Sequence, residues 1–289
     1  MSVEEALEVL KLKDTGEVSF SEKVFASMVR RAKIRFNYKT WIIFDFANTF
    51  FMVLTYFLLA FIITPEDISR AGYGPSYFAF ALVGIAISHY VTASLRSLSM
   101  TIRLEQFYGT IESILSTPTS FIVLFLGDIL YFFLYSTVFL VLILWLGLLL
   151  GAPIVISIET AFTLVVLVVL LMLSNLPIGI ASAAMVLKFK QGNPIGWALT
   201  WINQFFAGTF FPITLLPEEL RAISFILPLT FSLDAIRYSL IWGVGLLHPR
   251  ILGDIIYVIV YAVVGYPIAL KIFNVVYDDA RRGGGLGAY

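Results

Sequence analysis

Six long apolar stretches run through the sequence and constrain its fold more than any other feature. A helix needs about 20 mostly apolar residues to cross the hydrocarbon core of a bilayer. Charged residues make up 13% of the chain, about half of the roughly 25% that a soluble domain carries. The sequence therefore predicts an all-α polytopic membrane protein with six transmembrane helices. The stretches lie at residues 41–63, 77–95, 121–150, 161–187, 195–213 and 251–273.

Two charged tails flank this membrane domain of residues 41–273, one at residues 1–40 and one at residues 274–289. In the first tail, apolar and basic residues alternate at helical spacing, which predicts an amphipathic helix at the membrane surface. An ordinary polar tail is the alternative. The apolar positions are Phe20, Val24, Phe25, Met28 and Val29, and the basic positions are Lys23, Arg30 and Arg31.

The basic residues predict the orientation of the chain. Cytoplasmic segments of membrane proteins carry an excess of Lys and Arg. With a cytoplasmic N-terminus, 15 of the 19 basic residues lie in the cytoplasm. The other four, Arg70, Arg221, Arg237 and Arg250, lie outside. We therefore expect a multi-pass protein of the cell membrane with both termini in the cytoplasm.

The loop between the second and third stretches has the pattern of a short helix. Gly109 is suited to end the preceding helix, and Thr110 is suited to cap the next one. Glu112 in the first turn favours the helix dipole, and Pro118 ends the helix. The loop therefore predicts a short capped helix exposed to the cytoplasm, with a plain turn as the alternative. Its apolar face is Ile111, Ile114 and Leu115.

The loop between the fifth and sixth stretches is long, apolar and rich in proline. Pro217 fits the first position of a helix whose apolar run ends before Pro228. Such a run is too short to cross a bilayer, so we expect a re-entrant or interfacial helix. Asp234 and Arg237 are three residues apart and suited to pair on one helix face. An anchoring pair without a transport role is the alternative.

Polar residues within the stretches are few. Asp45 and Asp128 lie near the cytoplasmic ends of the first and third stretches, where a carboxylate can reach water. Asn48, Asn203 and Gln204 lie deeper and are candidates to line a pathway. Hydrogen bonding between helices is the simpler interpretation of these amides.

The sequence lacks the residues that several kinds of chemistry require. The chain has no Cys and only two His, which predicts no bound metal. It has no G-x-x-x-x-G-K-[ST] phosphate-binding loop and no catalytic motif of a protease or esterase. The chain is therefore not expected to be an enzyme, and any active transport needs energy from another polypeptide.

Two groups of residues together resemble the membrane subunit of the ABC-2 type exporters, a family of ABC transporter permeases. The first group is Glu105, Gly109, Thr110, Glu112, Leu115, Thr117 and Pro118. The second is Gly208, Phe210, Phe211, Pro212, Leu216, Pro217, Pro228, Leu229, Thr230, Asp234, Ala235, Arg237 and Gly243. Both groups lie where a six-span member of the family carries them.

The resemblance implies roles for these residues. The first group would form the coupling helix that docks on a cytoplasmic ABC ATPase, and the amphipathic segment would be the connecting helix. An outer re-entrant gate would include Phe211, Pro212, Leu216, Pro217, Pro228, Asp234 and Arg237. A second permease copy, identical or related, would complete the membrane unit. This chain would bind no cofactor, because ATP and Mg²⁺ would bind to the partner ATPase.

The resemblance further implies export of a small amphiphile, drug or lipid-like substrate. A stand-alone channel or secondary transporter is the alternative, and it would rely on Asp45 or Asp128 as its ion-coupled acid. A membrane scaffold without transport is a third possibility.

Overall fold

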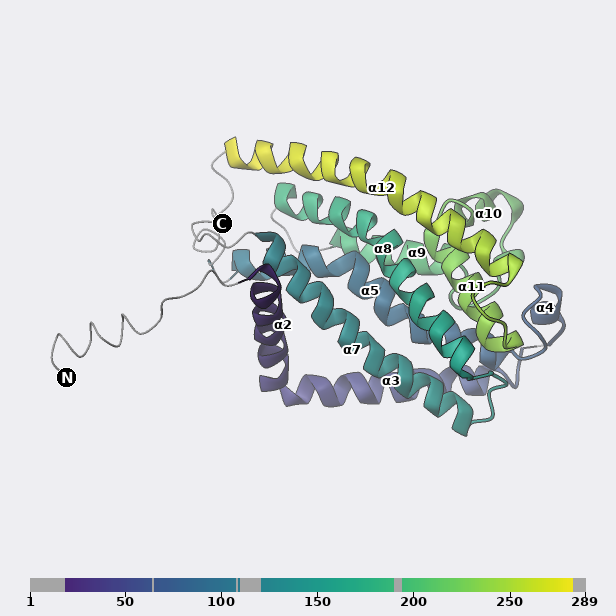
Figure 1. Cartoon of the computed structure of the whole chain (residues 1–289). Coiled ribbons are helices and arrows are strands. Elements are labelled where there is room, and N and C mark those ends of the chain that lie inside the picture. Colours follow the sequence, from purple (N-terminus) through teal and green to yellow (C-terminus); the bar gives the residue numbers. More distant parts are fainter. Residues whose placement is uncertain (1–18, 64, 108, 110–120, 190–193, 283–289) are drawn as a thin grey trace, which may run out of the picture.

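The computed structural model describes residues 19–63, 65–107, 109, 121–189 and 194–282, and these form helices joined by turns, with no strand among them (Figure 1). Five helices in this part of the chain are long and apolar enough to cross a membrane. They confirm the polytopic all-α fold and five of the six expected spans. They are α3 (Lys39–Leu59), α5 (Tyr77–Phe107), α7 (Phe121–Leu149), α8 (Ile158–Phe189) and α12 (Pro249–Arg282).

Shorter helices lie at both ends of this bundle (Figure 1). We name the two ends after the helix found at each, the α2 end and the α10 end. The C-terminal end of α12 lies at the α2 end (Figure 1). The shorter elements are α2 (Phe20–Asn37), α4 (Pro65–Arg70), α9 (Pro194–Phe206), the 3₁₀ turn η1 (Ile213–Leu215), α10 (Glu218–Ser224) and α11 (Pro228–Trp242).

Helix α5 forms the centre of the bundle. It packs against α7, α8, α9 and α11, and 89% of its span is buried. By contrast, α3 and α12 bury only 11% of their spans and present rows of exposed Phe, Ile, Leu and Val side chains. Such a surface is suited to lipid, because water would not solvate it.

The prediction of a complete fifth span at residues 195–213 is wrong. The helix in this region, α9, has 13 residues and ends at Phe206. At a rise of 1.5 Å per residue it is about 20 Å long, shorter than the hydrocarbon core of about 30 Å. Gly208 follows with a left-handed φ of 75°, and Pro212 lies four residues farther along. The apolar run therefore continues while the helix does not.

Helix α2 confirms the predicted N-terminal helix and lies across the end of the bundle (Figure 1). Its first turn is closed by a capping box between Ser19 and Glu22. The backbone N–H of Ser19 donates to the Glu22 carboxylate at 2.8 Å, which lowers the pKa of Glu22. The chain turns at Tyr38, and α3 begins at Lys39.

Candidate functional site

Helix α2 is joined to three membrane-length helices by three ion pairs. Its arginines occupy positions i, i+1 and i+5, and each meets an acid from a different helix. We call these three pairs the arginine clamp. The pairs are Arg30 with Glu105 of α5 at 3.0 Å, Arg31 with Asp128 of α7 at 3.8 Å, and Arg35 with Asp45 of α3.

Asp128 is the most deeply buried member of the clamp. Its side chain is 0% exposed, and Thr101 of α5 donates its hydroxyl to one carboxylate oxygen. The side chain of Arg31 is only 12% exposed, and its guanidinium lies over the ring of Phe132 at 5.3 Å. Removing one partner of such a buried pair typically costs about 3–5 kcal/mol, since the other charge is left without compensation.

The contact between α2 and α7 is close because α7 has no side chain at the crossing. A Cβ atom added to Gly127 would lie 2.5 Å from the Cβ of Ser27 and 2.8 Å from the backbone nitrogen of Met28. The hydroxyl of Ser27 also donates to the carbonyl of Leu124 at 3.4 Å. Small residues of this kind let helix backbones approach in membranes.

The structure describes two of the predicted coupling residues. The side chain of Glu105 is buried and directed toward Arg30. Gly109 is exposed, has a left-handed φ of 68°, and follows the end of α5 at Phe107, as expected of a residue that ends a helix. The other predicted coupling residues, Thr110, Glu112, Leu115, Thr117 and Pro118, lie outside the described residues, so their roles stay predictions.

A second polar centre lies at the α10 end, around Arg237 of α11. Its guanidinium is buried and donates three hydrogen bonds to backbone carbonyls. It also lies 3.5 Å from the centre of the Phe80 ring. The acceptors are Phe80 of α5 at 3.2 Å, Gly208 at 2.8 Å and Thr209 at 2.7 Å. Arg237 thus joins α11, α5 and the segment that follows α9.

This segment also approaches α5 directly. A Cβ atom added to Gly84 of α5 would lie 2.0 Å from the carbonyl oxygen of Thr209. Only glycine leaves space for that carbonyl, and the same carbonyl accepts from Arg237. The break after α9 is therefore held by two neighbouring helices.

The predicted pair of Asp234 with Arg237 is wrong. Asp234 instead accepts two hydrogen bonds from Arg250 of α12, both at 2.9 Å, and a third from the hydroxyl of Tyr73. Although the two predicted partners share a helix, Arg237 is directed inward to the carbonyls. Asp234 therefore joins α11 to α12 and to the turn before α5.

The remaining predicted gate residues form the turns of the α10 end. Pro217 directly precedes α10, and Pro228 is the first residue of α11. Pro212 and Leu216 are buried on either side of η1, while Phe211 is half-buried with its ring edge-on to Phe205 of α9 at 5.1 Å. These positions confirm a short helix between Pro217 and Pro228, whereas its re-entrant depth and the role of these residues in gating stay predictions.

The predicted pathway amides lie in different surroundings. Asn203 of α9 donates to the side-chain oxygen of Asn175 of α8 at 2.8 Å, so it bonds between helices. Gln204 is also buried, whereas Asn48 of α3 is exposed. Their role in a pathway stays a prediction.

The roles of several residues at these two centres were not predicted from the sequence. Arg30 and Arg31 were assigned to the polar face of a surface helix rather than to ion pairs within the protein. Tyr73 and the buried Asp254 were not considered, and Arg250 was counted only for the orientation. The spacing of the three α2 arginines is a usable signal, because it places all three along one side of a helix.

Comparison with known protein families gives a match that covers most of the chain. The family described as ABC-2 type transporter matches residues 23–241, which is 219 of the 289 residues. The matched region begins in α2 and ends in α11, so it contains the arginine clamp and Arg237 with its three acceptors, whereas Arg250 and Asp254 lie beyond it. No curated protein matches the chain.

Proposed function

The chain belongs to the ABC-2 type transporter family, and from this premise we propose that it is the membrane subunit of an ATP-driven exporter. Its membership makes it an ABC transporter permease with several membrane-crossing helices. The proposal adds that a separate cytoplasmic ABC ATPase supplies the energy and binds the ATP and Mg²⁺. It also adds that a second permease copy completes the pathway in the cell membrane, and that the substrate is a small amphiphile, drug or lipid-like molecule.

The arginine clamp is the observation that carries this proposal. Glu105 lies two residues before the end of α5, directly ahead of the predicted coupling helix. Through Arg30 the same residue is joined to α2, whose other arginines hold α7 and α3. A force applied at the end of α5 would therefore reach three membrane helices at once. A permease driven from outside its own chain needs such a connection.

The same clamp weighs against a secondary transporter. That alternative needs an acid in a membrane span that binds and releases an ion. The two acids considered for this role, Asp45 and Asp128, both pair with arginines of α2. Their charges are compensated in place, which favours a structural role.

The orientation is part of the proposal. We place the α2 end in the cytoplasm and the α10 end outside, as the distribution of basic residues predicts. In this orientation the coupling helix is available to the ATPase, and the segment around Arg237 closes the outer side. ATP-driven closure of the ATPases would then shift the permeases from inward-facing to outward-facing.

Purification of the tagged full-length chain from its native membrane tests the proposal. We expect an ATPase subunit to co-purify, and we expect its activity in proteoliposomes to rise when a transported amphiphile is added. Replacing Gly109 or Glu112 should separate ATP hydrolysis from transport, while the variants still elute as folded permeases in gel filtration. Transport by the purified chain without ATPase or nucleotide would overturn the proposal.

A further inference from the structure

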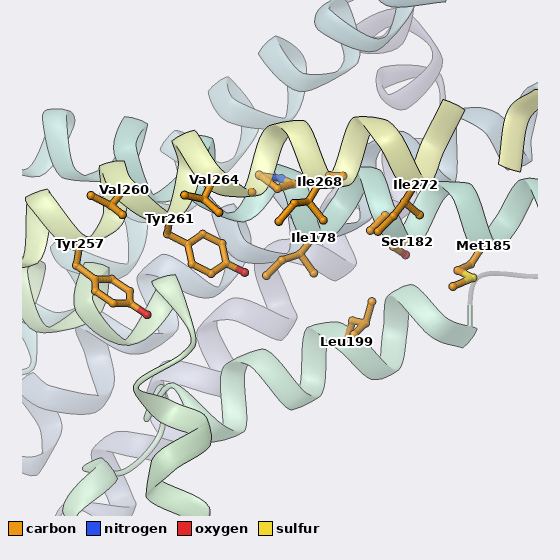
Figure 2. Close-up of a pocket in the computed structure, with 14 residues that line it drawn as sticks. Ile178, Ser182, Met185, Leu199, Tyr257, Val260, Tyr261, Val264, Ile268 and Ile272 are labelled. Atoms are coloured by element: carbon orange, nitrogen blue, oxygen red, sulfur yellow. The ribbon is translucent and has the colours of Figure 1, made fainter. Parts of the chain in front are cut away.

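A groove of about 640 Å³ runs along α12 on the side that faces α9 (Figure 2). Helix α8 forms its floor with Pro177, Ile178 and Ala181, and Leu199 of α9 lies at its far edge. Val264 and Ile268 are among the α12 side chains that form its wall. Nearly all of the lining is apolar.

The groove follows the seam between two closely packed helices. A Cβ atom added to Gly265 of α12 would lie 3.2 Å from the ring of Pro177 in α8. Pro177 lies within α8, where it removes one backbone hydrogen bond and bends a helix. Beyond this contact the lining includes small side chains, such as Ala181 and Ala269, which leave the space unfilled.

The groove is long and almost entirely apolar. Its α12 lining extends from Tyr257 to Ile272, which is about 22 Å of helix. An unbranched hydrocarbon chain can lie extended along a groove of this length and contact its apolar lining.

The polar groups lie at one end of the groove. Tyr261 points from α12 into the groove (Figure 2), and among the described residues its hydroxyl has no hydrogen-bond partner. The hydroxyl of Tyr257, one turn closer to the α10 end, donates to the carbonyl of Phe225 at 2.6 Å. The groove thus has two tyrosine hydroxyls toward the α10 end and an almost entirely apolar remainder.

We propose that the groove binds one acyl chain of a bilayer phospholipid, with its headgroup beyond Tyr257 and its chain directed toward Ile272. Membrane helices form the floor and both sides of the groove, so acyl chains are the apolar molecules most available to it. The tyrosines lie at the end where aromatic residues commonly meet the headgroup level. The inference concerns a bound lipid and does not depend on the proposed transport.

Photochemical labelling tests the inference. The full-length protein is placed in phosphatidylcholine nanodiscs with a phospholipid that carries a diazirine near the end of one acyl chain. After illumination, we expect labelled peptides to come mainly from the α8 and α12 segments that line the groove. Val264→Trp fills the groove, and we expect it to lower this labelling at least fivefold.

Val263→Trp is the matched control, since Val263 is 67% exposed and does not line the groove. We expect its labelling to equal that of the unaltered protein. If Val264→Trp does not elute as a folded protein, Ile268→Trp replaces it on the same wall. Equal labelling of α3, α7 and α12 that neither groove variant changes would show annular lipid only and overturn the inference. Cross-links between two chains within the groove would also overturn it.

Discussion

Arg237 combines a permanent charge with almost complete burial. Its guanidinium presents several donors in a fixed plane, and three backbone carbonyls from two separate segments accept from it. Backbone carbonyls near a helix break would otherwise lack partners in an apolar setting, where an unpaired polar group is costly. The arginine therefore satisfies the carbonyls at the break after α9, and these carbonyls in turn stabilise its buried charge.

Arg237→Lys is expected to destabilise the protein although it keeps the charge. A lysine ammonium is a compact donor group, so it cannot reach three carbonyls spread across a guanidinium plane. Each carbonyl left unpaired costs about 1–3 kcal/mol. We expect a loss of about 3 kcal/mol in the free energy of unfolding and a melting temperature in detergent lower by about 5–10 °C.

Arg221→Lys is the matched control for that measurement. Arg221 also donates to two backbone carbonyls, those of Thr214 and Leu216, but it lies at the surface of the α10 end. Water can replace the lost hydrogen bonds there, so we expect a shift of at most about 2 °C. Equal shifts for both variants would contradict the role given to the buried guanidinium.

The partners of individual charged residues could not be predicted from their spacing along the chain. The spacing of Asp234 and Arg237 is that of a helical ion pair, and their pairing was predicted for that reason. The real partner of Asp234 is Arg250, 16 residues farther along the chain and on another helix. Local spacing gives the faces of one helix, whereas such a contact depends on how two helices pack.

At the scale of elements, α2 shows how an amphipathic pattern can be interpreted in two ways. Basic residues opposite an apolar face predict a helix between lipid and water. In the structure the arginines are directed toward acids of α3, α5 and α7, while Phe25 and Phe36 are exposed. The pattern predicted that the helix exists. It could not distinguish phosphate headgroups from carboxylates, because both attract arginine.

The crossing of α2 and α7 leads to a prediction for Gly127→Ala. The added Cβ would overlap Ser27 and the backbone of Met28, so α2 must move away. Overpacking of this kind costs about 1–3 kcal/mol, although alanine favours a helix over glycine by about 1 kcal/mol. We expect faster amide hydrogen exchange in α2, which mass spectrometry of its peptides would detect.

Gly253→Ala in α12 is the control for this experiment. A Cβ added there meets nothing within 4 Å, so only the gain in helix propensity remains. We expect exchange in α12 to be unchanged or slower, and exchange in α2 to be unaffected. Unchanged exchange of α2 in the Gly127 variant would show that the two helices are not in close contact.

The pair between Arg30 and Glu105 leads to a prediction about coupling. Arg30→Glu would place two carboxylates together and should lower the amount of substrate transported for each ATP hydrolysed. The double variant Arg30→Glu/Glu105→Arg restores opposite charges and should recover most of that ratio. A double-mutant cycle on the free energy of unfolding should give a coupling energy between the two residues of about 1 kcal/mol or more, as for a charged hydrogen bond. A double variant no better than the single one would contradict a direct link between these residues.

At the scale of the whole molecule, hydropathy predicted the five complete spans because lipid imposes one requirement on every crossing helix. The fifth stretch met the same requirement in composition, yet Gly208 and Pro212 end its helix early. Hydropathy averaged over a window of residues does not reveal where a single glycine or proline ends a helix. The sequence also left open which helix is central. Burial of α5 depends on its packing against α7, α8 and α11, which no single stretch contains.

The orientation of the whole molecule is testable because the chain has no cysteine. Single cysteines at four exposed positions, Ala26, Asp279, Glu219 and Leu247, each report one end of the bundle. Positions 26 and 279 lie at the α2 end, which carries most of the basic residues and is therefore expected inside. A membrane-impermeant thiol reagent should label Glu219→Cys and Leu247→Cys in intact cells. Ala26→Cys and Asp279→Cys should react only after permeabilisation, and labelling of Ala26→Cys in intact cells would reverse the orientation, which would place the arginine clamp out of reach of a cytoplasmic ATPase.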